Sequence, residues 1–452
     1  MNVSFFGELL QTISERGRAL LARNRRVEAS ARSESLVELC EDLLSSRGEA
    51  SGVARAREIL SRYGELTTGP RIAFFEALSE RFGPDPARMQ AAIAAWRERP
   101  GDTTAAEVHA ASEPRRQELF RRFNLAPGGT VALVHMREQL MDALGHRDDL
   151  AAVDEDFIHL FSSWFNRGFL VLRHIDWSTP AIVLEKIIRY EAVHEISDWD
   201  DLRRRIDPPD RRCYAFFHPA LVDDPLIFVE VALTRDIPGA IAPILATGRE
   251  VVEPDKMRTA VFYSISNCQR GLAGVSFGSF LIKQVVEEIC REMPKLSTFV
   301  TLSPMTSFAS WLAHERSEAN SVALNEADKT LFAALDDPDW WRDADKAARL
   351  QDPLMRAAAW YLLRACSERG LPADAVARFH LGNGARLERI NWLADTSDKA
   401  IAQAHGMMVN YLYDLDDIEK NHEAYAEGPT VVAASAVQRL LRPPLELVPI
   451  SG

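Results

Sequence analysis

The chain of 452 residues is poor in cysteine, and its five cysteines are widely scattered. No two of them form a CxxC pair, so the spacing typical of structural zinc sites is missing. Five dispersed cysteines in a chain of this length also do not make a disulfide framework. We therefore expect no metal site and no disulfide-rich fold. Cys268 lies beside a glycine-bearing loop, and we expect a small buried residue there rather than a reactive thiol.

The sequence also lacks any apolar run of 18 residues without charges, and it shows no basic segment followed by an apolar core of signal-peptide length. Basic residues are outnumbered by acidic ones, which gives a formal net charge of −13. This balance argues against general binding of nucleic acids or anionic membranes. The last residues, VPISG, are not a Ser-Lys-Leu peroxisomal signal. We expect a soluble, cytoplasmic protein with no nucleic-acid and no membrane partner.

With 47% hydrophobic and 26% charged residues, the composition is that of a globular protein with a large core. Residues 1–165 place apolar and charged side chains at three- and four-residue spacing, which predicts a helical bundle used for packing and self-association. After Pro180 we expect a helix over Ala181–His194, and then strands over Arg212–Phe217 and Leu226–Leu233. The second domain is predicted to span 166–452 and to end in a helix over Val431–Leu441.

The most informative stretch runs from Thr259 to Phe308. It predicts a strand over Thr259–Ser266, a loop with three spaced glycines, and a helix that starts near Ser279 and is closed by Pro294. The next strand, Phe299–Leu302, leads into Ser303 and Pro304. Glycines and a helix N-terminus together favour an anion site, although the spacing fits neither a Rossmann fingerprint nor a nucleotide P-loop. A plain structural turn remains open as an interpretation of the loop alone.

Four segments carry a more specific signal, namely FYSISNCQRGLAGVSFGSFLIK, LSPMTSF, RFHLGNGARLERINWLADTS and GMMVNYLYDL. In these segments and in their order, the chain resembles the malonyl-CoA decarboxylase family. The resemblance implies an α+β fold class, with an all-helical N-terminal bundle followed by a GCN5-related N-acetyltransferase-like mixed-sheet domain. It implies conversion of malonyl-CoA to acetyl-CoA and CO2. If hydrogen-bond donors stabilise the enolate, this reaction needs no cofactor beyond the coenzyme A of the substrate. We expect the helical domain to assemble a homo-oligomer, a dimer or a tetramer.

Ser303 and His380 are the first candidates for catalysis. Ser303 ends a predicted strand, where a ligand can approach, but on the residues alone a serine that caps the next helix is the preferred interpretation. His380 can donate a hydrogen bond or a proton near neutral pH. The resemblance aligns the two with the family's catalytic serine and histidine. We expect them to grip the malonyl carboxylate together and then to protonate the acetyl carbanion, without an acyl-enzyme.

Several other residues are predicted to support this pair. Tyr413 and Asn391 are catalytic candidates for hydrogen bonds around the carboxylate or the histidine, and both could equally be core polar residues with satisfied hydrogen bonds. A nucleophilic serine could use Asp395 or Asn391 as its third, orienting group. Family members can carry a glutamate where this chain has Ser276, so a general acid at that position is either absent here or not essential to the family. The predicted substrate-binding residues are Ser264 and, through backbone N–H groups, Ala273, Gly274, Val275, Ser276, Phe277, Gly278 and Ser279.

Two other functions fit the same residues. An acyl-CoA-dependent N-acyltransferase needs a base to deprotonate its amine, and Glu253 and Asp255 are near enough in sequence to be considered. A coenzyme-A-sensing or scaffold protein built around the helical domain needs no turnover at all. An incubation with malonyl-CoA and no acceptor separates the decarboxylase from the acyltransferase, because only a decarboxylase then makes acetyl-CoA in step with CO2. The sensor is favoured if the parent shows no turnover and Ser303→Ala and His380→Ala keep their affinity for acyl-CoA.

Overall fold

The structure is a computed structural model, and it describes residues 35–45, 48–275, 281–367, 370–428 and 430–441. The chain divides into two compact units. The first contains the residues up to 171 together with the short segments 217–226 and 269–278. The second contains residues 172–216, 227–268 and those from 279 onward. The glycine-bearing loop after residue 268 therefore belongs to the first unit, together with the helices.

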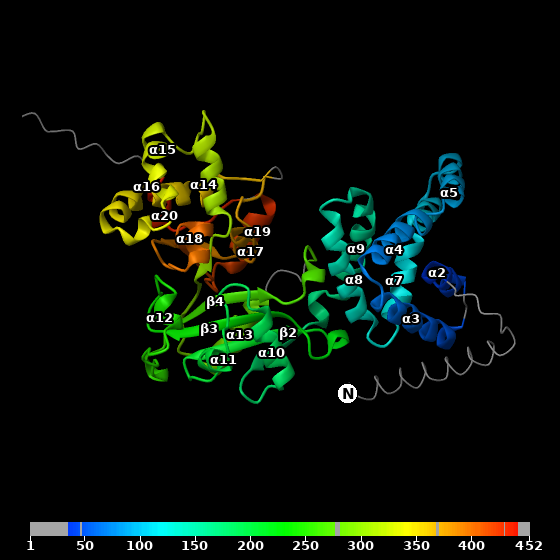
Figure 1. Cartoon of the computed structure of the whole chain (residues 1–452), viewed down its shortest axis with the longest axis horizontal. Coiled ribbons are helices and arrows are strands. Elements are labelled where there is room, and N and C mark those ends of the chain that lie inside the picture. Colours follow the sequence, from blue (N-terminus) through cyan, green and yellow to red (C-terminus); the bar gives the residue numbers. More distant parts are fainter. Residues whose placement is uncertain (1–34, 46–47, 276–280, 368–369, 429, 442–452) are drawn as a thin grey trace, which may run out of the picture. The chain divides into compact units, whose positions relative to one another are not determined.

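The first unit is built from helices, as the spacing of its apolar residues predicts (Figure 1). Its interior is aromatic, with the rings of Phe120 and Phe157 stacked 4.2 Å apart. A buried ion pair between Arg116 and Asp156 ties α7 to α9. The helices are α2 (Leu36–Ser45), α3 (Glu49–Gly64), α4 (Thr68–Arg81), α5 (Pro86–Glu98), α6 (Asp102–Ser112), α7 (Arg115–Asn124), α8 (Gly129–Leu144) and α9 (Ala151–Trp164).

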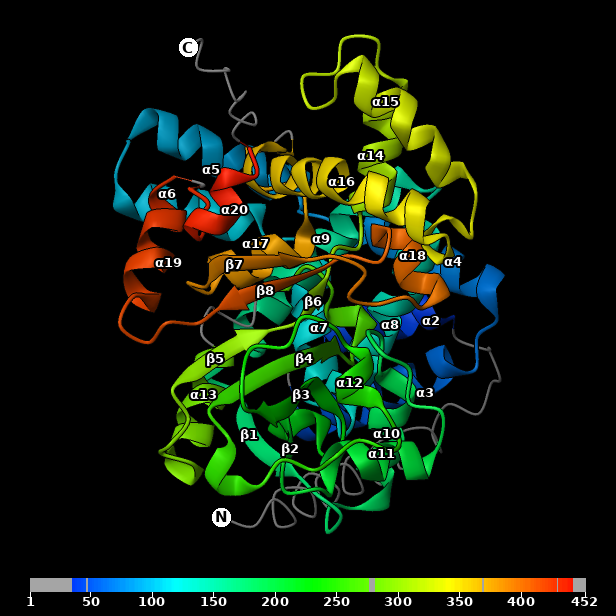
Figure 2. The same ribbon diagram turned by 90° about the vertical axis from the view of Figure 1, so that its left-hand side faces the viewer.

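The second unit is organised around a mixed sheet with the strand order β1-β2-β3-β4-β5-β8-β6, and β7 pairs with β8 (Figure 2). Its strands are β1 (Val171–Ile175), β2 (Arg211–Phe217), β3 (Pro225–Thr234), β4 (Thr259–Asn267), β5 (Thr298–Thr301), β6 (Ser303–Pro304), β7 (Arg386–Asn391) and β8 (Met408–Leu412). Its helices are α10 (Ala181–Tyr190), α11 (Trp199–Ile206), α12 (Ala242–Leu245), α13 (Leu281–Glu292), α14 (Phe308–Ser317), α15 (Glu326–Phe332), α16 (Ala344–Arg364), α17 (Ala375–Gly382), α18 (Asp398–Ala404), α19 (Ile418–Glu427) and α20 (Ser435–Arg439).

The centre of the sheet is the unit β4–α13–β5. Strand β4 pairs antiparallel with β3 and parallel with β5, and a parallel pair needs a crossover such as α13. The buried face of α13 carries Ile282, Val285 and Ile289 at helical spacing. Beyond β5, Ser303 pairs with Val409 of β8. The fold class expected from the sequence, a helical region followed by a mixed-sheet domain, is confirmed.

Two expected helices end differently from the prediction. The helix after Pro180 stops at Tyr190 rather than His194, because the carboxylate of Glu191 accepts the backbone N–H groups of Val193 and His194 and turns the chain. The expected helix over Val431–Leu441 is reduced to α20. Before α20 the chain is extended and exchanges backbone hydrogen bonds with Leu387 of β7, which suits its β-branched residues.

Among the described helices, none combines the length and the apolar composition that a membrane span requires.

Candidate active site

Ser303 and His380 come together although they are far apart in the sequence. Ser303 lies on β6 and is 6% exposed, and His380 lies on α17 and is 3% exposed. The distance from Ser303 Oγ to His380 Nε2 is 3.1 Å. The hydroxyl of Ser303 donates to Thr301 Oγ1 at 2.9 Å. The two side chains are therefore within hydrogen-bond distance of each other.

His380 is held on its other side by Tyr413. The distance between His380 Nδ1 and the Tyr413 hydroxyl oxygen is 2.8 Å. The imidazole also stacks on the ring of Tyr411, with centroids 4.7 Å apart. Burial lowers the pKa of His380 to about 3, so the imidazole is neutral at pH 7. Burial also raises the pKa of Tyr413, which therefore keeps its proton.

The contacts favour one set of hydrogen-bond directions. Because the hydroxyl of Ser303 donates to Thr301, its oxygen is free to accept from His380. The neutral imidazole then carries its proton on Nε2 and accepts from Tyr413 at Nδ1. The chain runs from Tyr413 through His380 and Ser303 to Thr301. In this arrangement His380 does not take a proton from Ser303, as the base of a nucleophilic serine must.

Ser303 and His380 lie in the wall of a cavity of about 450 Å³ in the second unit. Much of the wall is apolar and includes Phe262, Ile265 and Phe379. Polar groups from three other places also reach it, namely His194 after α10, Asp395 before α18, and Lys399 on α18. A mostly apolar cavity with a few converging polar groups is typical of a small-molecule site.

The structure places Asn391 and Asp395 away from the roles expected of them. The side chain of Asn391 bonds Arg389 and Asn410, and Asn410 in turn donates to the backbone oxygen of Thr301. Asn391 thus supports the strands beneath Ser303 and does not contact His380. Asp395 lies near His194, with 4.0 Å between its carboxylate and Nδ1. The group that orients His380 is Tyr413, which the sequence analysis ranks only as a supporting candidate.

Ser264 does not line the cavity, contrary to the prediction, and its contacts show why. Its neighbours Tyr263 and Ile265 line the cavity, whereas the hydroxyl of Ser264 donates to the carboxylate of Glu191 at 2.7 Å. Because side chains alternate along a strand, Ser264 points away from its two neighbours. Its role is to hold Glu191, which shapes the segment after α10.

The glycine-bearing loop lies in the first unit and packs against α8. A Cβ on Gly271 would lie 2.1 Å from the backbone oxygen of Val134, so close packing requires this glycine. Arg137 donates to the backbone oxygens of Gly271 and Ala273 at 2.8 and 2.7 Å. Gly274 has a φ of +78°, which favours glycine.

Two of the N–H groups predicted to hold the substrate are used within the loop itself. Ala273 N donates to the oxygen of Arg270 at 2.9 Å, and Val275 N donates to the oxygen of Leu272 at 3.0 Å. These two amides are committed to the turn in this structure. The other predicted members, Ser276, Phe277, Gly278 and Ser279, lie outside the described residues. Cys268, just before the loop, is buried as expected.

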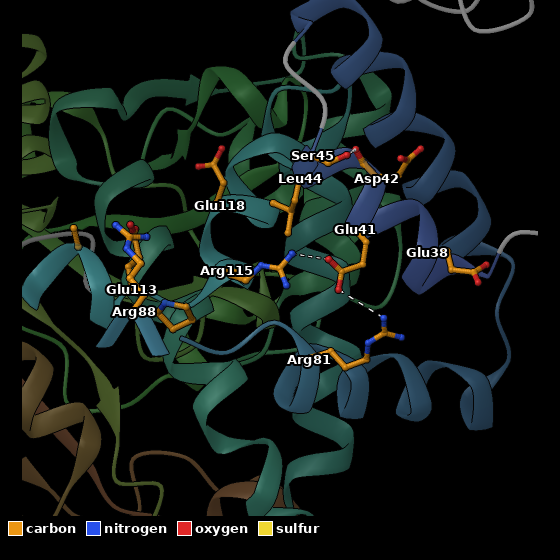
Figure 3. A pocket seen from close by; sticks show the side chains of 12 residues that line it. Glu38, Glu41, Asp42, Leu44, Ser45, Arg81, Arg88, Glu113, Arg115 and Glu118 are labelled. Carbon is orange, nitrogen blue, oxygen red and sulfur yellow. Dashed lines mark hydrogen bonds and ion pairs between the residues drawn. The ribbon is translucent and has the colours of Figure 1, made fainter. Parts of the chain in front are cut away.

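The first unit contains a larger hollow, of about 860 Å³, that is a poor candidate for an acyl-CoA site (Figure 3). It is lined by charged side chains of both signs. Figure 3 shows two of its arginines, Arg81 and Arg115, directed at the same carboxylate, that of Glu41. Cations that are paired in this way offer little to a phosphate. Size alone does not decide the assignment, and the smaller cavity holds the reactive groups.

Comparisons with known proteins identify the family of the chain. Residues 82–165 match the family model described as the malonyl-CoA decarboxylase N-terminal domain, and residues 168–448 match the malonyl-CoA decarboxylase C-terminal domain. The mitochondrial malonyl-CoA decarboxylase of the goose Anser anser anser is 36% identical over 420 residues, which are 85% of this chain and 82% of the goose protein.

Solved structures give the same result. The crystal structure of malonyl-CoA decarboxylase from Rhodopseudomonas palustris is 58% identical, with a TM-score of 0.87 over 89% of this chain and 98% of that chain. The enzyme from Agrobacterium vitis is 55% identical, with a TM-score of 0.86 over 90% of this chain and 100% of that chain. The protein therefore belongs to the malonyl-CoA decarboxylase family.

Proposed function

We propose that this protein converts malonyl-CoA to acetyl-CoA and CO2, and that Ser303 and His380 handle the carboxylate and the proton. The family assignment supports the reaction. The single observation that supports the residues is the hydrogen-bonded chain of Ser303, His380 and Tyr413 at the wall of the cavity.

The reaction breaks the bond between the carboxylate carbon and the α-carbon. Its electron pair stays on the α-carbon and delocalises onto the thioester oxygen, while CO2 leaves. One proton must then be added to the α-carbon, so each turnover consumes a proton from solvent. A site for this reaction needs donors for the carboxylate and the enolate oxygen, and a proton placed beside the carbon.

The neutral pair of Ser303 and His380 is suited to both tasks. A neutral donor pair can bind the ionised carboxylate without the strong ion pair that would resist its conversion to CO2. To donate to the substrate, the Ser303 hydroxyl turns its proton away from Thr301, while its oxygen still accepts from His380 Nε2. The imidazole N–H can then replace the proton that the hydroxyl gives to the carbanion. Tyr413 holds the imidazole with its proton on Nε2, toward Ser303. The proton that the pair gives up is restored from solvent.

Acylation of Ser303 is the less favoured route. A serine nucleophile passes its proton to the histidine, whereas this hydroxyl donates to Thr301. Decarboxylation also gains little from an acyl-enzyme. We propose a reaction that needs no metal and no cofactor, because the carbanion is stabilised by the thioester of the substrate itself.

The deciding experiment is incubation of the protein with malonyl-CoA and no acceptor. Acetyl-CoA and CO2 should appear in a one-to-one ratio. An N-acyltransferase gives neither product under these conditions, and a coenzyme-A-sensing protein binds without turnover. The bases considered for an acyltransferase offer no support for that alternative. Glu253 and Asp255 are both exposed, and Glu253 is ion-paired with Lys256.

We further propose that residues 1–165 form an oligomerisation domain and residues 166–452 the catalytic domain. We also propose that the protein is a cytoplasmic homo-oligomer. The glycine-bearing loop from Ala273 to Ser279 is proposed to bind the coenzyme A part of the substrate. Light scattering after gel filtration tests assembly, and cell fractionation tests location. The loop is tested by Gly274→Ala, which introduces a side chain at positive φ and should raise KM with kcat nearly unchanged.

A further inference from the structure

One loop in the cavity wall has its backbone held by hydrogen bonds from two side chains. It runs from Glu191 to Glu195, between α10 and α11. The carboxylate of Glu191 accepts the N–H groups of Val193 and His194 at 2.7 and 2.8 Å. The guanidinium of Arg205 donates to the backbone oxygens of His194 and Glu195 at 2.7 and 2.8 Å. The backbone on both sides of His194 is thereby held in place.

Both of these clamps are themselves anchored in the second unit. Glu191 accepts hydrogen bonds from the hydroxyls of Ser264 and Ser266 on β4. Arg205 bonds Glu230, a fully buried carboxylate on β3. Two neighbouring strands of the sheet therefore set the position of His194. A backbone fixed by several hydrogen bonds around one side chain is expected where that side chain must meet a ligand in a fixed geometry.

The imidazole of His194 has a polar atom without a protein partner. Its side chain is only 8% exposed and lines the same cavity as Ser303 and His380. Its Nε2 is buried and has no hydrogen-bond partner among the residues that the structure describes. Buried polar atoms are nearly always satisfied, so this one points to a missing partner. Because His194 lines the cavity, a ligand bound there can supply that partner.

The surroundings of His194 define what kind of partner is missing. Burial lowers its pKa to about 4, so the ring is neutral at pH 7. The carboxylate of Asp395 lies 4.0 Å from Nδ1 and favours a proton on that nitrogen. Nε2 is then a lone-pair acceptor. It repels a carboxylate and suits a ligand N–H group.

We propose that His194 Nε2 accepts a hydrogen bond from the amide N–H of the substrate's pantetheine arm that lies nearest the thioester. This inference rests on the proposed function and adds a residue to it. The ionised malonyl group has no N–H or O–H, so the first donors along the substrate are the two amides of the arm. The amide next to the cysteamine unit is the one closest to the acyl group that Ser303 and His380 must reach. His194 thereby sets how deep the thioester enters the cavity.

The test removes either the acceptor on the protein or the donor on the substrate. The substrates are malonyl-CoA, the malonyl thioester of N-acetylcysteamine, which keeps the amide, and its analogue with an ester oxygen in place of N–H. The variants are His194→Leu, which removes the acceptor, and His194→Gln, whose amide oxygen can replace Nε2. Gln403→Leu is the matched control, because Gln403 lines the same cavity without a place in the proposed contact.

In the parent protein the change from amide to ester should lower kcat/KM about tenfold, which corresponds to about 1.4 kcal/mol. His194→Leu should raise KM for malonyl-CoA about tenfold, with kcat within about threefold, and should no longer distinguish amide from ester. His194→Gln and Gln403→Leu should keep the distinction. This cycle isolates the one contact, because a variant that merely perturbs the wall does not abolish the discrimination.

The proposal is overturned if His194→Leu keeps the parent's KM, or if it still discriminates amide from ester tenfold. Should His194→Leu fail to fold, the parent protein with the two cysteamine thioesters decides alone, and equal kcat/KM values reject the contact. Failure of the proposed function has a different signature, namely no CO2 from malonyl-CoA in the parent protein. In that case the affinity of the parent and of His194→Gln for acetyl-CoA, measured by calorimetry against His194→Leu, still tests the contact.

Discussion

Replacement of Tyr413 by phenylalanine tests how the imidazole is oriented. The hydroxyl lies 2.8 Å from His380 Nδ1, and both residues are almost completely buried. Phenylalanine keeps the ring and removes only the donor. Nδ1 then has no donor facing it, and the neutral imidazole can move its proton to Nδ1. Ser303 would face a lone pair in place of an N–H.

The size of the effect follows from the cost of an unsatisfied buried polar atom, about 1–3 kcal/mol. At about 1.4 kcal/mol for each factor of ten, this corresponds to a loss of about 5- to 150-fold in kcat. We expect a value near thirtyfold, with KM changed by less than about threefold, because Tyr413 acts on His380 and not on the coenzyme A part of the substrate. Release of acetyl-CoA and CO2 from malonyl-CoA measures both constants.

Tyr411, on β8 and two residues before Tyr413, provides a matched control. Its ring stacks on His380, and its buried hydroxyl has no partner among the described residues. Unlike His194, Tyr411 does not line the cavity, so this hydroxyl is not placed to meet a ligand. Tyr411→Phe therefore removes a hydroxyl and keeps the stacking, and kcat should stay within about twofold of the parent. The reasoning is refuted if Tyr413→Phe turns over at the parent rate, or if the two variants lose activity equally.

Three further predictions follow from the same geometry. Ser303→Ala and His380→Ala should each lower kcat at least about a hundredfold, the scale of losing a key donor or proton-transfer group, and a parent-like rate in either removes that residue from the mechanism. Burial lowers the pKa of His380 to about 3 from 6.5, so between these values only the unfolded chain takes up the proton at this position. This histidine's contribution to the free energy of unfolding is present above pH 6.5 and declines as the pH falls toward 3. Urea unfolding at pH 7 and 5 should show a larger loss in the parent than in a folded His380→Gln variant, and equal losses contradict the assignment. A chelator such as EDTA should leave the rate unchanged, whereas inactivation that added metal reverses would overturn the metal-free proposal.

Much of the second unit could be predicted because its signals are local. The alternating residues of β4 and the helical spacing in α13 identify the strand–loop–helix–strand unit without reference to the rest of the chain. The contact between Ser303 and His380 could not be predicted from such local signals. Nothing between the two positions indicates that they approach to 3.1 Å, and the expectation came from the resemblance to the family.

The sequence could not reveal contacts that depend on distant packing. Glu191 bonds Ser264, 73 residues away, and the carboxylate ends α10 earlier than helical spacing suggests. Gly271 looks like part of a phosphate loop in sequence, yet its small size is required by Val134 of α8. One signal was available for Tyr413, since Tyr411 and Tyr413 are two residues apart beside a strand and so face the same way.

The most direct measurement of the central claim is a single experiment without any acyl acceptor, in which malonyl-CoA labelled at the free carboxylate is mixed with the parent protein and with Ser303→Ala. We predict labelled CO2 and acetyl-CoA in equal amounts from the parent, no acyl group on the protein, and a rate at least about a hundredfold lower in the variant. Absence of labelled CO2 from the parent, or a covalent acyl group on Ser303 that precedes acetyl-CoA, would contradict the account.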